Sequence, residues 1–118
     1  MQSDLESLRD LVRQFADERD WDKFHTPKNL ATALAVEASE LLEPFQWLTS
    51  GDKNELDEGK QAAIRHEMAD VLLYLVRLAD KLDVDLYRAC LEKMDINRAK
   101  YPAEKVRGDS RKYSDYKN

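Results

Sequence analysis

The sequence is poor in the residues that build disulfides and tight turns. Its 118 residues include 1 Cys, 3 Gly and 3 Pro. The lone Cys90 excludes an internal disulfide, and no base stands beside it, so a small core residue is the better interpretation than a nucleophile. No stretch alternates in the manner of a β-strand, and there is neither an internal repeat nor a Gly-rich phosphate loop. These absences favour an all-α fold.

Positive charge and long apolar runs are also scarce. The net charge is −5, which disfavours nucleic acid or an anionic membrane as the main partner. The acidic first residues lack the apolar stretch of a signal peptide or membrane span, so we expect a cytoplasmic protein. A hydrophobic content of 42% is enough for one domain but not for a generous core, and oligomerisation would help.

Apolar residues recur at helical spacing in the first half of the chain. From about Ser3 to Arg19 they predict a helix that Ser3 or Asp4 caps. A connector with two aromatic residues and a histidine follows. Thr26 then predicts an N-cap, with Pro27 at the first helical position. Pro44 predicts a kink or break near the end of this second helix, because proline lacks a backbone N–H.

The second half predicts two further helices. A polar, breaker-rich loop precedes a helix from about Lys60 to Leu82. One apolar face of this helix, formed by Ile64, Val71, Leu75, Leu78 and Leu82, is expected to build the bundle. An opposite apolar face includes Leu73 and Val76, and it predicts a subunit interface. Asp83 or Asp85 caps a last helix that ends at Tyr101-Pro102, so we expect a helical domain over residues 1–102 and a flexible tail over 103–118.

Two pairs of acids stand within apolar helical sequence: Glu37 with Glu40, and Glu67 with Asp70. Side chains at i and i+3 point in nearly one direction, so two packed helices could converge all four carboxylates. Isolated acids at this spacing are usually solvated surface, whereas convergent ones repel each other and need cations. A site with only oxygen ligands predicts Mg²⁺, with Mn²⁺ as a possible substitute, rather than zinc.

Several side chains are candidates for holding a substrate, each with a structural alternative. Trp21 and Trp47 could stack on a base, because indole faces stack on heterocycles, or they could plug the core. Tyr74 follows Asp70 by about one helical turn and could reach a sugar or phosphate, or pack in the core. His25 could contact the same groups or hold its own loop by hydrogen bonds.

The acid pattern E-x-x-E, spacer, E-x-x-D resembles the signature of the all-α MazG-like nucleoside triphosphate pyrophosphohydrolases. The similarity covers nearly the whole chain and is greatest to the dCTP pyrophosphatase branch. It is carried by residues 15–16, 18–21, 24–25, 45–47, 70–72, 74–76, 93–98 and 101–102. Two positions depart from the pattern: Val12 stands where animal enzymes have a polar pocket residue, and Pro44 interrupts the helix of the first acid pair.

This resemblance implies a four-helix-bundle-like oligomer, commonly a homotetramer. It also implies Mg²⁺-dependent hydrolysis of a (deoxy)nucleoside triphosphate, dCTP or a modified dCTP, to the monophosphate and pyrophosphate, which would clear the nucleotide pool. The implied metal ligands are Glu37, Glu40, Glu67 and Asp70, and the implied pocket residues are Trp21, His25, Trp47 and Tyr74. Lys93 and Asn97 match a motif near the phosphates, although Lys93 could equally be a solvated helix residue.

The residue chemistry agrees with that reaction. A triphosphate brings about four negative charges, so it can bind an acidic site only through cations. A catalytic carboxylate within reach of water could accept its proton, and we expect Glu40, or otherwise Glu37, in this role. The alternatives are a phosphoribosyl-ATP-type pyrophosphohydrolase and a non-catalytic helical module that binds partners through its acids. A di-iron bundle would need Glu-x-x-His pairs, which these motifs lack.

Overall fold

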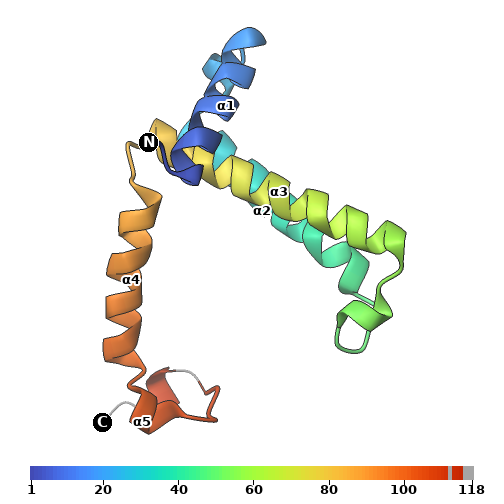
Figure 1. The fold of residues 1–118 in the computed structure, drawn as a ribbon, viewed down its shortest axis with the longest axis vertical. Helices are drawn as coiled ribbons and strands as arrows, with labels where there is room; N and C mark the ends of the chain where they lie inside the picture. The colour runs from blue at the N-terminus through green and yellow to red at the C-terminus, as the bar shows by residue number, and fades with distance from the viewer. Residues whose placement is uncertain (112, 116–118) are drawn as a thin grey trace. The chain divides into compact units, whose positions relative to one another are not determined.

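The structure, a computed structural model, describes residues 1–111 and 113–115. Every regular element within these residues is a helix (Figure 1). The α-helices are α1 (Asp4–Glu18), α2 (Pro27–Leu42), α3 (Glu58–Lys81), α4 (Leu86–Lys100) and the short α5 (Ala103–Val106). Short 3-10 turns are η1 (Asp22–Phe24), η2 (Glu43–Phe45), η3 (Lys53–Glu55) and η4 (Tyr113–Asp115). The predicted all-α class is confirmed, whereas the four-helix-bundle arrangement stays a prediction.

The helices begin at residues whose side chains cap them. The Ser3 hydroxyl accepts a hydrogen bond from the Glu6 backbone N–H at 3.2 Å, in a capping box that opens α1. Thr26 caps α2 and Asp85 caps α4, so both predicted starts are confirmed. Helix α3 begins at Glu58, slightly earlier than predicted, because Asp57 caps it by accepting from the Lys60 N–H at 2.8 Å.

The connection between α2 and α3 is an ordered loop. Helix α2 ends at Leu42, and the proline-containing turn η2 follows, which confirms the predicted break. The Glu55 carboxylate accepts hydrogen bonds from the backbone N–H groups of Thr49 at 3.0 Å, Ser50 at 2.9 Å and Gly51 at 2.9 Å. Gly51 has φ 76°, and a Cβ added there would lie 2.7 Å from Cδ1 of Phe45, so glycine is required at this position.

The chain forms two compact units, Met1–Val84 and Asp85–Asn118. In the first, α2 runs alongside α3 and α1 packs against α3 (Figure 1). Its buried apolar core consists of Ala16, Leu30, Ile64, Val76 and Ala79. In the second unit the rings of Tyr101 and Tyr113 meet edge to face, with centroids 6.0 Å apart. The predicted boundary at residue 102 and the flexible tail, parts of which lie outside the described residues, stay predictions.

Four burial predictions are wrong. Val76, expected at a subunit interface, is only 3% exposed and lies in the core of the first unit. Leu75 and Leu82, expected in the bundle core, are 36% and 53% exposed. Cys90, expected in a core, is exposed. Helical periodicity separates the faces of a helix but does not say which neighbour covers each face, and this explains the errors.

Large apolar side chains remain uncovered on the first unit. Leu42 is 62% exposed, and Met68 is 54% exposed. Leu11 and Trp47 are exposed as well. No helix in the described ranges has both the length and the apolar character needed to cross a bilayer.

Candidate functional site

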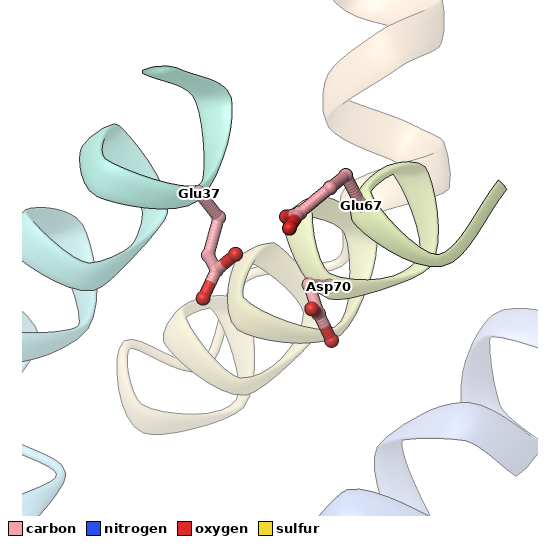
Figure 2. A group of neighbouring side chains, drawn as sticks. All are labelled: Glu37, Glu67 and Asp70. Atoms are coloured by element: carbon pink, nitrogen blue, oxygen red, sulfur yellow. The ribbon is translucent and has the colours of Figure 1, made fainter. Parts of the chain in front are cut away.

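Three of the predicted metal ligands converge between α2 and α3. Glu37 reaches from α2 toward Glu67 and Asp70 of α3 (Figure 2). One carboxylate oxygen of each lies within 4.8 Å of those of the other two. The i, i+3 spacing aims the two α3 acids at the same neighbour, as the sequence predicts. Glu40 is not part of this group, although its carboxyl is close enough to Glu37 for the contact to raise its pKa.

The cluster consists of like charges that the chain leaves uncompensated. Contact with the Glu67 carboxyl, followed by burial, raises the pKa of Glu37. Contact with Glu37 and the repulsion between the two charges raise the pKa of Glu40. The Oε2 atoms of Glu37 and Glu67 are buried and accept no hydrogen bond from the described part of the chain. Clustered carboxylate oxygens without partners fit a hard divalent cation.

A cavity of about 580 Å³ adjoins the cluster. Its apolar wall comes from α1 and consists of Leu8, Leu11, Val12 and Phe15. The connector contributes Trp21 and His25, and α3 contributes Asp70, Leu73, Tyr74 and Arg77. The apolar surface with a few polar groups at one side is typical of a small-molecule site. Leu73 lines this cavity, and its predicted place at a subunit interface stays a prediction.

Aromatic rings form one corner of the cavity. The rings of Phe15 and Trp21 meet edge to face, with centroids 5.7 Å apart and an interplanar angle of 73°. The rings of Trp21 and His25 follow at 6.3 Å and 68°. The Arg19 guanidinium lies 3.7 Å from the centroid of the Phe15 ring. Because each ring holds the next, the corner presents a rigid surface suited to a planar ligand.

The structure brings some of the predicted substrate residues together and not others. Trp21, His25 and Tyr74 line the one cavity. Trp47 lies outside it and is 89% exposed. Lys93 and Asn97 lie on α4, in the second unit. The binding roles of all these residues stay predictions.

Sequence reasoning missed Arg77, whose side chain is only 3% exposed. It donates hydrogen bonds to Asp22 at 2.8 Å, to Asp80 at 3.1 Å and to Nδ1 of His25 at 3.1 Å. The only signal in the sequence is the local spacing of Arg77 and Asp80, which is common on exposed helices. Of the α1 wall, the family resemblance indicated only Val12 as a pocket position, whereas Leu8 and Leu11 read as ordinary core residues.

Comparison with known proteins gives a consistent result. The family model described as the MazG-like family matches residues 32–116. The chain is 50% identical over 113 residues to human dCTP pyrophosphatase 1, with 94% of this chain and 66% of the human protein covered. It is 47% identical over 118 residues to the rat dCTP pyrophosphatase 1, with the same coverage. The chain thus spans a little under two thirds of these relatives' length.

A solved structure is similar as well. The crystal structure of a pyrophosphatase from Archaeoglobus fulgidus superimposes with a TM-score of 0.79 and is 43% identical in sequence. The similarity covers 86% of this chain and 95% of the archaeal one.

Proposed function

The chain belongs to the MazG-like family, and from this premise we propose that it is an Mg²⁺-dependent nucleoside triphosphate pyrophosphohydrolase. The proposed substrate is dCTP or a modified dCTP, and the products are the monophosphate and pyrophosphate. One observation carries the proposal: Asp70 belongs both to the acid cluster and to the cavity lining. A nucleotide whose base enters the cavity would therefore extend its phosphates toward a cation held by the cluster. Similarity to dCTP pyrophosphatases supports the choice of base.

The acid cluster is the proposed metal centre. Glu37, Glu67 and Asp70 would hold Mg²⁺, with Glu40 beside them as a further ligand. A bound Mg²⁺ neutralises phosphate charge and stabilises the charge that develops on leaving pyrophosphate. The cation would bind tightly here because its positive charge would offset the repulsion between the carboxylates.

The remaining roles follow from position. Trp21, supported by Phe15, would stack on the base, and Tyr74 would contact the sugar or a phosphate. Glu40 is the proposed general base for the attacking water, because a carboxylate with a raised pKa is a better proton acceptor. Glu37 is the second candidate for this role.

The roles of Trp47, Lys93 and Asn97 rest on the family resemblance alone. Lys93 and Asn97 would act near the phosphates, and Trp47 would bind the nucleotide.

We also propose that the protein works as a homo-oligomer in the cytoplasm, most simply a tetramer. The exposed Leu42, Met68 and Trp47 support this, because a subunit interface would bury apolar surface that the single chain leaves open to water. Nucleic acid and membranes are not proposed as partners, in keeping with the net charge of −5. Sedimentation of the purified chain measures its mass directly, and a monomer at micromolar concentration would contradict the proposal.

A panel of canonical and modified triphosphates with Mg²⁺, read by product chromatography, tests the activity. We expect dCMP and pyrophosphate from dCTP. Hydrolysis of phosphoribosyl-ATP alone would point to the related pyrophosphohydrolase, and no hydrolysis of any compound would favour a binding module. Removing free Mg²⁺ with the chelator EDTA should abolish hydrolysis.

Asp70→Asn tests the metal centre. Loss of one ligand carboxylate should lower kcat by at least about 100-fold while the oligomer sediments as before. Glu58→Gln is the matched control, because Glu58 is an exposed acid on the same helix outside the cluster, and its turnover should be unchanged. Equal activities of the two variants would remove the metal-centre proposal.

A further inference from the structure

One ring nitrogen of His25 faces the guanidinium of Arg77, a group that can only donate hydrogen bonds. The Nε–H of Arg77 points at Nδ1 of His25, with 3.1 Å between the two nitrogens. A guanidinium has only donors, so Nδ1 must act as an acceptor and cannot carry a hydrogen. The neutral imidazole therefore carries its hydrogen on Nε2. Among the residues that the structure describes, none forms a hydrogen bond with that second nitrogen.

Two carboxylates hold the guanidinium of Arg77 in place. Its two Nη atoms donate to Asp22 of η1 and Asp80 of α3, and its side chain is almost fully buried. Asp22 also accepts from Nζ of Lys81 at 2.6 Å, and Asp80 also accepts from Arg13. Because the donor cannot rotate away, the His25 ring cannot turn over without losing its hydrogen bond. The edge of Trp21 adds a contact on the ring.

From this geometry we infer that Arg77 is a positioning residue that fixes His25 as a neutral Nε2–H hydrogen-bond donor to the ligand of the cavity. The ligand atom opposite His25 must then be a hydrogen-bond acceptor, such as a carbonyl oxygen, an unprotonated ring nitrogen or a hydroxyl oxygen. A donor such as an exocyclic amine would not fit. The inference rests on the proposed function in one respect, that the cavity holds the nucleotide.

The charges around His25 favour the same state. Burial lowers the pKa of His25, and the positive charges of Arg77 and Lys81 lower it further, against the opposing Asp22 carboxylate. A protonated ring would turn Nδ1 into a donor facing a donor. His25 should therefore remain neutral at a pH where an unrestrained histidine begins to protonate.

Nitrogen NMR of the ligand-free protein tests the tautomer without any assay of activity. Long-range proton–nitrogen spectra distinguish the Nε2–H form from the Nδ1–H form, and a His66→Gln variant assigns the signals of the two histidines. We expect His25 to show the Nε2–H form. An Nδ1–H form, or a mixture of both forms, would overturn the inference.

Arg77→Met tests the positioning role. The variant keeps an apolar stem in the buried position, and it should fold because Arg13 still pairs with Asp80 and Lys81 with Asp22. We expect the KM for dCTP to rise roughly tenfold, with kcat changing less than about threefold, as for the loss of a binding hydrogen bond. The rise should shrink as the pH falls, because protonation restores a hydrogen to Nε2. A KM that is unchanged, or an effect independent of pH, would overturn the role.

Lys81→Met is the matched control. It removes a nearby positive charge but leaves the hydrogen bond from Arg77 to His25 in place. Its His25 signals should keep the Nε2–H form, and its KM should match that of the unmodified chain. If dCTP is not hydrolysed at all, the proposed function fails while the NMR result still decides the tautomer, so the two failures are distinguishable.

Discussion

Charge is buried in opposite ways at two places along α3. Around Arg77, each charged group faces a partner of opposite sign, and the guanidinium donates hydrogen bonds to Asp22, Asp80 and His25. Around Glu67, carboxylates face carboxylates, and two buried oxygens accept no hydrogen bond from the described chain. The first group is complete within the protein, whereas the second requires a cation from outside.

The difference separates charges that the fold itself compensates from charges that need a bound cation to compensate them. A buried charge without a partner costs several kcal/mol, so a fold keeps one only where something else supplies the partner. Paired charges offset that cost internally and need no ligand to compensate them. Removing a charge should therefore have opposite effects on stability in the two groups.

The largest expected effect comes from breaking the paired group. Asp80→Ala removes one acceptor of Arg77 and the partner of Arg13, and it leaves a guanidinium buried with less compensation. We expect the free energy of unfolding to fall by about 2–4 kcal/mol, measured in urea. Asp95→Ala is the control, because Asp95 and Arg98 form an exposed pair, whose loss should cost less than about 1 kcal/mol. Equal losses in both variants would contradict the comparison.

Supplying a cation to the unpaired group should have the next largest effect. At a free Mg²⁺ concentration about 100 times its Kd, the unfolding free energy should rise by about 2.7 kcal/mol, measured as a higher Tm than in EDTA. Glu37→Gln should reduce this metal effect strongly. In EDTA the same variant should melt above the unmodified chain, because it removes a carboxylate whose pKa is raised by contact with Glu67 and by burial. A lower Tm for the variant in EDTA would show that the cluster is stabilising by itself.

The smallest effect on stability is expected at Glu55, a carboxylate outside both groups that accepts hydrogen bonds from backbone N–H groups. Hydrogen bonds from the backbone of Ser50 and Thr49 lower the pKa of Glu55 from its usual 4.5 to about 2. Since the folded pKa lies below the unfolded one, this contribution to stability is complete above about pH 4.5 and is lost as the pH falls toward 2. Glu55→Gln should therefore be less stable than the unmodified chain at neutral pH. The difference between the two should narrow in acid, and a difference independent of pH would contradict the assignment.

Local signals were sufficient to predict the four long helices, α1 to α4. Ser3, Thr26 and Asp85 cap as expected, because a cap involves only the next few residues. The acid pairs were equally visible, since their spacing and apolar flanks lie within one helical segment. The convergence of Glu37, Glu67 and Asp70 needed only the further assumption that α2 and α3 pack together.

Long-range relationships could not be predicted in the same way. The partners of Arg77 include Asp22 and His25, which lie far away in sequence and on an irregular connector. Nothing in the composition of that connector indicates which helix it contacts. Val76 was assigned to the wrong surface because a helix with two apolar faces does not reveal which face its own chain covers.

The close contact of Gly51 with Phe45 has a consequence for how this sequence can evolve. A side chain at position 51 would have to occupy the space of the ring, and it would also have to adopt a positive φ. A smaller residue at position 45 would remove the contact with the ring but would leave the positive φ, so position 51 would still favour glycine. We expect a smaller residue at 45 to suppress Gly51→Ala only in part in a genetic screen, because the strain of the positive φ remains.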